Sequence, residues 1–273
     1  MPELPEVETI VKDLLGAVLN KKIVALKVFP GSERLFIKHR SSYFKKQLIN
    51  HSVNHLSRHG KYIIFHLSEK KFLIMHLRMT GSMSVSTRKN SQLKYEKIRI
   101  IFSDDTAISF MDIRKFGTID IVNTLDILKD KLGPDAISDE FNVEFLVDQL
   151  KRKQSSIKAA LLDQRIAAGV GNIYADEACW DAKINPLAPA ASLKKKQINQ
   201  LCNSIKMVLN NSISNRGTSI NNYMDLAGNQ GYHQTKVAVY GRNGEPCIKC
   251  RSIIIKIRVV GRGTFYCPKC QNK

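Results

Sequence analysis

The chain has 273 residues, and its 43 Lys and Arg residues outnumber 24 Asp and Glu residues to give a formal net charge of +19. An excess of this size favours an anionic partner, nucleic acid first and an anionic membrane surface second. No apolar run approaches the roughly 18 residues that a membrane span needs, and the acidic N-terminus is unlike a secretory signal. We therefore expect a cytoplasmic, nucleoid-associated protein with no membrane partner.

The chain begins with a predicted helix and a chemically unusual residue before it. Residues 5–20 carry apolar side chains at helical spacing, and Pro and Glu suit the first turn of a helix. If Met1 is removed, Pro2 becomes a secondary α-amine. Such an amine titrates near pKa 8 and can attack an aldehyde-like carbon to form an iminium ion. These residues alone favour a plain helix start, and a nucleophilic terminus is the alternative.

Between about residue 22 and residue 122 the sequence changes to short apolar runs that polar turns separate. The clearest runs have the length and β-branched composition of strands: residues 23–28, 62–67, 72–77 and 98–102. Many short strands at hairpin spacing predict a β-sandwich or a β-barrel.

The loops between these runs combine cations with small or apolar residues. Three stretches have this character: Arg58-His59-Gly60-Lys61, His76-Leu77-Arg78-Met79-Thr80-Gly81 and Asp112-Ile113-Arg114-Lys115-Phe116-Gly117. An apolar side chain on a basic loop is what insertion into a DNA base stack requires. Met79 and Phe116 are therefore predicted either to pack in the core or, together with Arg114, to form such a wedge.

The hydrophobic pattern of the sequence changes again at Leu132-Gly133-Pro134-Asp135, which we interpret as a linker. Beyond it, helical periodicity covers residues 141–153, 157–164, 173–180 and 193–214. A glycine-rich turn leads into the third of these helices, with Asn172 as the expected N-cap. Free backbone N–H groups at such a start suit a phosphate, and Lys158 on the preceding helix could contact the same strand. An ordinary capped helix is the alternative.

Four of the six cysteines form two Cys-x-x-Cys pairs with sixteen intervening residues: Cys247, Cys250, Cys267 and Cys270. This spacing matches a tetrahedral four-thiolate zinc site. Because four protein ligands leave no coordination position open, we expect one structural Zn²⁺. The residues between the pairs predict a hairpin with Gly261-Arg262-Gly263 at its tip, where Arg262 suits a phosphate or a groove.

Together these motifs closely resemble the bacterial formamidopyrimidine-DNA glycosylases. The resemblance spans essentially the whole chain, from Pro2-Glu3-Leu4-Pro5-Glu6-Val7-Glu8 through the loop motifs and the Gly169–Glu177 stretch to the cysteine array. It implies an α+β fold in which a catalytic β-sandwich with an N-terminal helix occupies residues 1–132. A helix–two-turn–helix bundle (residues 133–236) and a zinc finger (residues 237–273) would follow. The implied activity is excision of oxidised purines from duplex DNA, followed by cleavage at the abasic site.

The resemblance also implies roles for single residues. Pro2 attacks C1′ of the damaged nucleoside, Glu3 helps open the sugar and Glu6 is a supporting carboxylate. Lys61 and Arg262 match the family's proton donors for β- and δ-elimination. The remaining matches are DNA contacts. Contacts on phosphates or beside the orphan base are implied for His76, Arg114, Lys158 and Asn172. A place in the gap left by the flipped base is implied for Met79 and Phe116.

Three positions qualify this transfer of roles. A guanidinium stays protonated at any reasonable pH, so Arg262 is chemically better suited to clamp a phosphate than to donate a proton. Tyr95 stands where family members commonly carry a histidine that touches DNA. Residues 218–234 match the mobile loop that covers the flipped base, and the atoms that would read the base there are not assigned.

Two alternative functions remain open at this point. One is an endonuclease VIII-like glycosylase for oxidised pyrimidines. The other is a non-catalytic DNA-binding zinc protein, which retention of Met1 would favour because the nitrogen of Pro2 would then be an amide. The expected partner is damaged double-stranded DNA, and we expect a monomer.

Overall fold

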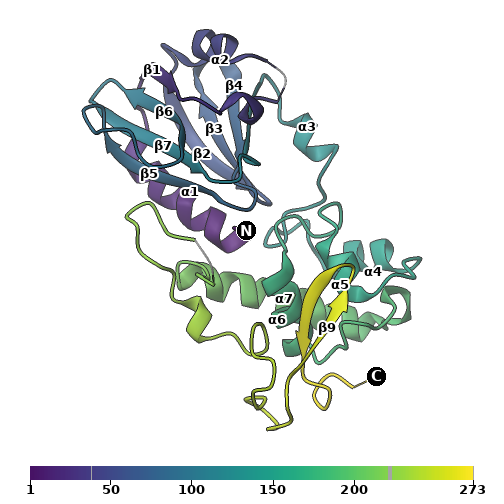
Figure 1. Cartoon of the computed structure of the whole chain (residues 1–273). Helices are drawn as coiled ribbons and strands as arrows, with labels where there is room; N and C mark the ends of the chain where they lie inside the picture. Colours follow the sequence, from purple (N-terminus) through teal and green to yellow (C-terminus); the bar gives the residue numbers. More distant parts are fainter. Residues whose placement is uncertain (38, 221–222, 273) are drawn as a thin grey trace. The chain divides into compact units, whose positions relative to one another are not determined.

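The computed structural model describes residues 1–37, 39–220 and 223–272 (Figure 1). The chain forms two compact units, and each contains two stretches of sequence. The N-terminal unit comprises residues 1–130 and 215–232, and the C-terminal unit comprises residues 131–214 and 233–273. Within the described ranges no helix combines the length and the apolar character that crossing a membrane requires.

Helix α1 (Leu4–Val18) begins with a capping box, in which the Glu3 and Glu6 side chains each accept a backbone N–H of the other residue. Pro5 lies in its first turn, where a missing N–H has no cost. The helix packs against β2, β3 and β5 and buries the apolar face that the sequence predicts, including Val7, Ile10 and Leu14. Each of these side chains contributes about 1.5–3 kcal/mol through burial.

The N-terminal unit contains two four-stranded antiparallel sheets, with the strand orders β1-β6-β7-β5 and β2-β3-β4-β8. Phe65 and Met75 of one sheet and Ile100 and Phe110 of the other belong to the same buried core, as a sandwich requires. The β-sandwich prediction is therefore confirmed. The strands are β1 (Ile23–Val28), β2 (Val53–His59), β3 (Tyr62–Leu67), β4 (Lys71–His76), β5 (Gly81–Thr87), β6 (Glu96–Phe102), β7 (Thr106–Asp112) and β8 (Thr118–Val122).

Short helical elements complete this unit. Helix α2 (Ser41–Leu48) contacts β1 and buries only Phe44 and Leu48, so its sequence lacks a clear apolar stripe. The others are the 3-10 turns η1 (Glu33–Leu35) and η2 (Ser68–Lys70) and the single-turn helix α3 (Asp126–Lys129).

Residues 215–232 return from the C-terminal part of the chain to pack on the N-terminal unit. Arg216 joins Asp13 of α1 at 2.6 Å and Asp225 at 2.7 Å, and Leu226 enters the sandwich core. This segment overlaps the loop that was expected to cover a flipped base. Positions 221 and 222 of that loop lie outside the described residues.

The C-terminal unit contains the predicted helices as α4 (Val143–Leu150), α5 (Ile157–Leu162), α6 (Asn172–Asp181) and α7 (Lys195–Ser214), with the 3-10 turns η3 (Ala190–Ser192) and η4 (His233–Thr235). Helix α6 packs against α5, α7 and the final hairpin. The stretch interpreted as a linker is tightly packed in this unit, because a Cβ at Gly133 would lie 2.1 Å from the carbonyl oxygen of Arg165.

The final hairpin pairs β9 (Ile255–Val259) with β10 (Arg262–Tyr266). Its two-residue turn is Val260-Gly261, with φ of +47° and +71°, as hairpin turns of this length favour. The prediction of a Gly-Arg-Gly tip is therefore wrong. Arg262 is the first residue of β10, paired with Val259, so its backbone has a defined strand geometry.

Candidate functional site

The N-terminus is held by the first turn of α1. Pro2 is buried, and the Glu3 side chain is held by the capping box at the positive end of the helix, where a carboxylate is favoured. Glu6 accepts the Glu3 N–H through one carboxylate oxygen and the Thr218 N–H through the other, both at 2.8 Å. Glu6 therefore joins the backbone beside Pro2 to the returning segment of residues 215–232.

Lys61 lies in the two-residue turn between β2 and β3. Gly60, with φ of +57°, allows this tight turn. Arg58 donates to Glu8 of α1 at 2.8 Å and to the Gly60 carbonyl at 3.0 Å. The turn that carries Lys61 is therefore tied to the helix that carries Pro2 and Glu3.

His76 ends β4 as a buried, neutral imidazole. Burial, followed by the positive charges of Arg78 and Lys61, lowers the pKa of His76 from 6.5 to about 3. Its Nδ1 accepts the backbone N–H of Arg78 at 2.9 Å, so the ring proton lies on Nε2. The Nε2–H can therefore act as a neutral hydrogen-bond donor, as the predicted phosphate contact requires.

Met79, Arg114 and Phe116 form one exposed cluster, although the sequence separates them into two loops. The Arg114 guanidinium lies 4.8 Å from the centroid of the Phe116 ring, and its Nη1 lies 3.4 Å from the Met79 sulfur. Met79 is 43% exposed and Phe116 is 47% exposed. The core-packing alternative is therefore wrong for both side chains, and a wedge of the three remains open.

Asp112 organises both loops of this cluster from below. Its buried carboxylate accepts the Thr80 hydroxyl at 2.5 Å, the Arg114 N–H at 3.2 Å and the Gly117 N–H at 2.7 Å. Asp112 begins one of the basic loop motifs in the sequence, but no role was predicted for it. An Asp just before a turn is a recognised signal for such capping, and it could have identified this residue.

Tyr95 lies in the loop before β6, with φ of +62° and 44% of its side-chain surface exposed. A buried ion pair anchors this loop, because Arg99 donates to Glu96 at 2.7 Å and also to the carbonyl groups of Asn90 and Ser91. The Tyr95 carbonyl accepts the N–H of Asp112, which joins this loop to the base of the exposed cluster.

Lys158 does not lie at the surface, where the sequence predicted a contact with a DNA strand. Its side chain is 0% exposed, and its ammonium lies 2.7 Å from Asp176 of α6. The same ammonium donates to the Gly263 carbonyl and to the Thr264 hydroxyl. A direct contact between Lys158 and a DNA strand does not fit this burial, because leaving the pair would isolate the Asp176 carboxylate in the interior.

Asn172 is likewise committed to the hairpin. The N-cap of α6 is Gly171, so the prediction that Asn172 is the N-cap is wrong. The Asn172 amide donates to the Gly263 carbonyl at 3.0 Å and to the Tyr240 hydroxyl at 3.3 Å. These two bonds use both of its amide hydrogens, so in this arrangement any phosphate contact by Asn172 must come from its backbone N–H.

The acidic residues of α6 face away from the helix start. Glu177 is buried and accepts the backbone N–H groups of Ala238, Val239 and Tyr240 at 2.7–2.9 Å. Burial raises the pKa of Glu177, and these donors oppose the rise. Neither Glu177 nor Asp176 therefore places an exposed carboxylate beside a phosphate at the N-terminus of α6.

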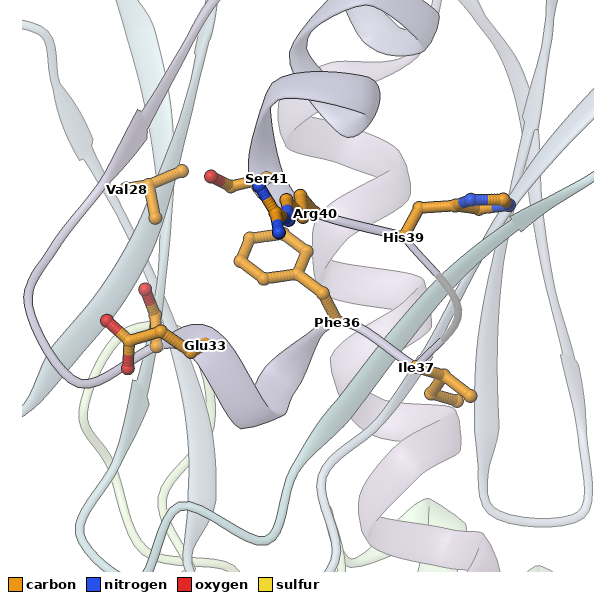
Figure 2. Close-up of a pocket in the computed structure, with 8 residues that line it drawn as sticks. Val28, Glu33, Phe36, Ile37, His39, Arg40 and Ser41 are labelled. Carbon is orange, nitrogen blue, oxygen red and sulfur yellow. The ribbon is translucent and has the colours of Figure 1, made fainter.

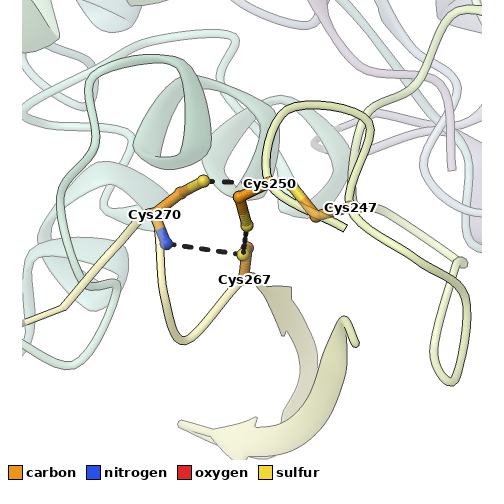
Figure 3. Close-up of side chains that lie close together, drawn as sticks. All are labelled: Cys247, Cys250, Cys267 and Cys270. Atoms are coloured by element: carbon orange, nitrogen blue, oxygen red, sulfur yellow. Dashed lines mark hydrogen bonds between the residues drawn. The ribbon is translucent and has the colours of Figure 1, made fainter. Parts of the chain in front are cut away.

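The four predicted zinc ligands meet at the base of the hairpin (Figure 3). Their sulfur atoms all lie within 4.8 Å of one another, with 3.9 Å between Cys247 and Cys270 and 3.4 Å between Cys250 and Cys267. A tetrahedron with zinc–sulfur bonds of 2.3 Å has edges of about 3.8 Å. The four thiol groups therefore fit one structural Zn²⁺.

The surroundings of the four sulfur atoms differ, because burial and the neighbouring thiols raise the pKa of Cys267 and Cys270. The pKa of Cys247 is lowered although burial opposes its ionisation, because backbone N–H groups of Cys250 and Lys249 donate to it. The Lys249 ammonium lies 4.0 Å from the centroid of the Trp180 ring. Backbone N–H groups therefore favour the thiolate of Cys247, and a bound metal would hold all four ligands deprotonated.

A cavity of about 510 Å³ lies at a different place in the N-terminal unit, between β1, η1 and the start of α2 (Figure 2). Glu33, Phe36, His39 and Arg40 are among the residues that line it. None of the predicted catalytic or DNA-contacting residues lines this cavity, so it is separate from the candidate site.

Three family models match successive parts of the chain. Residues 1–119 match the formamidopyrimidine-DNA glycosylase N-terminal domain, and residues 132–224 match the H2TH domain of the same family. Residues 244–273 match a zinc finger found in FPG and IleRS. The four zinc-ligand candidates fall within this last match.

Curated relatives match along the full length. The chain is 39% identical to a formamidopyrimidine-DNA glycosylase of Protochlamydia amoebophila and 38% identical to one of Lactococcus lactis, with 100% of each chain covered.

Solved structures agree with these relatives. A Lactococcus lactis FPG mutant bound to DNA containing Fapy-dG superposes with a TM-score of 0.92 at 36% identity over 100% of both chains. A MutM complex with DNA containing carbocyclic 8-oxo-G superposes with a TM-score of 0.91 at 36% identity, again over 100% of both chains. The agreement of sequence, fold and zinc-finger match leads to one conclusion: the chain belongs to the formamidopyrimidine-DNA glycosylase family.

Proposed function

We propose that this chain removes oxidised purines from duplex DNA, with the Pro2 amine as nucleophile, and then cleaves the abasic site. Family membership supports a bifunctional DNA glycosylase and AP lyase acting in base excision repair. The observation that carries the residue assignment is the buried start of the chain before α1, where Pro2 and Glu3 adjoin Glu6, whose two carboxylate oxygens each accept a backbone N–H. Removal of Met1 is required, because only then is the Pro2 nitrogen an amine.

The chemistry follows from the nucleophilicity of a secondary amine and from the electron demand of the iminium ion that it forms. The Pro2 nitrogen forms a bond to C1′ of the damaged nucleoside, the bond from C1′ to the base breaks, and the base leaves with a proton. Glu3 supplies a proton that opens the sugar ring, which allows the iminium ion to form. The positive iminium then acidifies the C2′ proton, whose loss breaks the C3′–oxygen bond and releases the 3′ phosphate.

A second elimination breaks the C5′–oxygen bond and leaves a one-nucleoside gap. Lys61 is the proposed proton donor for the first elimination, since Arg58 ties its turn to α1. Arg262 is better assigned to hold a phosphate, because a guanidinium is always charged and presents parallel N–H donors to phosphate oxygens.

Damaged duplex DNA is the proposed partner, since structural relatives were crystallised with DNA containing Fapy-dG or an abasic site. In this role the cluster of Met79, Arg114 and Phe116 fills the gap left by a flipped base. His76 donates a neutral hydrogen bond to a phosphate, and Tyr95 offers an exposed ring on the loop whose carbonyl accepts the Asp112 N–H. The net charge of +19 supplies the long-range attraction. We further propose a monomer that works on the bacterial nucleoid.

Zinc has a structural role in this proposal. Four thiolate ligands leave it no open position for substrate, so its contribution is to close the chain at the base of the hairpin. Cys247 and Cys267 are fully buried beside Trp180 and Phe265, so the hairpin strands and the metal site share one small core. Loss of the metal should therefore disorder the hairpin and Arg262 with it.

The proposal is tested by trapping the iminium ion with borohydride. Protein lacking Met1 is incubated with a duplex that contains 8-oxoguanine opposite cytosine, and the covalent adduct is measured beside Glu3→Gln. We expect the unaltered protein to form the adduct. Glu3→Gln should lose base excision, by 100-fold or more as a rough expectation for an acid catalyst, yet keep some cleavage of a pre-formed abasic site.

The controls separate the alternative functions. Protein that retains Met1 should form no adduct, and a parallel duplex with thymine glycol should react more slowly. A preference for thymine glycol would favour the oxidised-pyrimidine enzyme. Absence of any adduct with either lesion would favour a non-catalytic DNA-binding protein, and equal loss of both activities in Glu3→Gln would refute the role given to Glu3.

A further inference from the structure

A buried charged group supports the strand on which Arg262 lies. Lys158 of α5 and Asp176 of α6 are both 0% exposed and form an ion pair at 2.7 Å. The Lys158 ammonium also donates to the Gly263 carbonyl at 3.0 Å and to the Thr264 hydroxyl at 2.8 Å. Its bonds therefore reach from two helices to two successive residues of β10.

Thr264 passes this support to Arg262. The Thr264 hydroxyl accepts from Lys158, and it donates to the carbonyl oxygen of Arg262 at 3.3 Å. The Thr264 side chain is fully buried, whereas Arg262 is exposed. Residues two apart on a strand point to the same face, so the buried hydroxyl anchors the face from which the Arg262 side chain projects.

Two further bonds hold the next positions of the strand. Asp176 accepts the Phe265 N–H at 2.9 Å, and Asn172 donates to the Gly263 carbonyl at 3.0 Å. All of these bonds lie within the C-terminal unit. An isolated two-stranded hairpin is marginally stable at best, so β9 and β10 depend on such external anchors for a fixed geometry.

We propose that Lys158, Asp176 and Thr264 are positioning residues, which hold the backbone of Arg262 so that its guanidinium is presented to a DNA phosphate. This inference rests on the proposed function, since it takes the phosphate contact of Arg262 as given. Holding the backbone in advance lowers the ordering cost that binding would otherwise carry. The energetic role of Lys158 in DNA binding is therefore exerted through Arg262.

The sharpest test removes one hydroxyl and leaves the buried ion pair in place. Thr264→Val deletes the bond from Lys158 and the bond to Arg262 at nearly constant volume, whereas Thr264→Ser keeps the hydroxyl. Each variant is made with Arg262 intact and with Arg262→Ala. Affinity is measured for a duplex that contains a stable tetrahydrofuran abasic analogue, over a series of salt concentrations, with zinc content and melting temperature recorded for each protein.

With Arg262 intact, Thr264→Val should weaken binding about 3- to 10-fold, the factor expected for a lost hydrogen bond. It should also flatten the dependence of affinity on salt, as loss of about one phosphate contact does. Thr264→Ser should change affinity less than twofold. In the Arg262→Ala background Thr264→Val should add less than a twofold change, because its effect passes through the missing guanidinium. An equal effect in both backgrounds, or none in either, would overturn the inference.

A measurement without DNA separates this inference from the proposed function. Hydrogen exchange of the backbone amides of residues 259–266 should be faster in Thr264→Val than in Thr264→Ser, while exchange in α1 stays the same. Identical exchange in the two variants would contradict the positioning role even if DNA binding behaved as proposed. Faster exchange in Thr264→Val than in Thr264→Ser, together with no binding of damaged duplex by the unaltered protein, would support the anchoring of β10 by Thr264 and refute the proposed function.

Discussion

The two units of this protein use their predicted contact residues in opposite ways. In the N-terminal unit the predicted contact residues Arg114, Met79 and Phe116 are exposed, and a buried carboxylate supports them through backbone N–H groups. In the C-terminal unit the predicted contacts Lys158 and Asn172 are themselves the support, bonded to the hairpin. The comparison shows that a family motif can mark either a contact or its scaffold, and that the hydrogen bonds already made by a side chain's donor groups distinguish the two.

The largest expected effect comes from breaking the scaffold of the C-terminal unit. Lys158→Met should lower the free energy of unfolding by about 3–5 kcal/mol, because it leaves the Asp176 carboxylate buried without its partner. Adding Asp176→Asn to Lys158→Met should recover a large part of this loss, since no buried charge remains and the amide oxygen can still accept the Phe265 N–H. Urea unfolding of both proteins measures this, and a double variant less stable than Lys158→Met would refute a buried ion pair.

A smaller effect is expected from the scaffold of the N-terminal unit. Asp112→Ala should cost about 2–3 kcal/mol of unfolding free energy, because the Thr80 hydroxyl and the Arg114 and Gly117 N–H groups lose one buried acceptor. Thr80→Val is the matched control and should cost about 1 kcal/mol, since it removes the hydroxyl bond to Asp112 while the Arg114 N–H, which also donates to Thr80, keeps its Asp112 acceptor. If both substitutions cost the same, Asp112 does not hold the two loops together.

The neutral state of His76 gives a pH dependence with a defined sign. Its pKa is lowered in the folded protein from 6.5 to about 3, first by burial and then by Arg78 and Lys61. The corresponding stability is therefore complete above pH 6.5 and is lost as the pH falls toward 3.

Between pH 8 and pH 5 the unaltered protein should lose about 2 kcal/mol more of its unfolding free energy than His76→Gln does. The comparison of the two proteins isolates His76, because burial also lowers the pKa of His233, to about 4. Parallel curves for the two proteins would show that folding does not lower the pKa of His76.

The smallest effect concerns the hairpin turn. Val260 is β-branched and adopts φ of +47°, which is unfavourable for such a side chain. Val260→Asn should raise the free energy of unfolding by about 1 kcal/mol, because Asn tolerates this region. Val260→Ala is the control for loss of the branched side chain. If Asn gives no gain over Ala, strain at this turn does not limit hairpin stability.

Much of the fold could be predicted from local pattern. Helix α1 and strands β1, β3, β4 and β6 have continuous apolar faces, and the cysteine spacing identifies the metal site. Four strands were not among the runs named from the sequence: β2, β5, β7 and β8. Strand β2 lies at a sheet edge, where only Val53 and Leu56 are buried and its other positions are polar or exposed. An edge strand needs fewer apolar residues than a central one, so its sequence resembles a loop.

The residue types of the candidate site could also be predicted from the sequence, but the orientation of their side chains could not. Lys158 lies on a short helix beside a glycine-rich turn, and this sequence pattern is equally compatible with a phosphate contact and with a buried ion pair. Its partners Asp176 and Thr264 are far away in sequence, and only the fold brings them to the same ammonium. The prediction of a Gly-Arg-Gly tip was wrong for a similar reason. The register of β9 and β10, rather than the glycine content, places the turn at Val260 and Gly261.

The most direct test of the central claim locates the covalent bond. Protein lacking Met1 is trapped with borohydride on an 8-oxoguanine duplex, digested and mapped by mass spectrometry. The expected result is that the sugar remnant lies on the N-terminal peptide, attached to the Pro2 nitrogen. A remnant on Lys61, or on any other lysine with Pro2 unmodified, would contradict the assignment of Pro2 as the nucleophile.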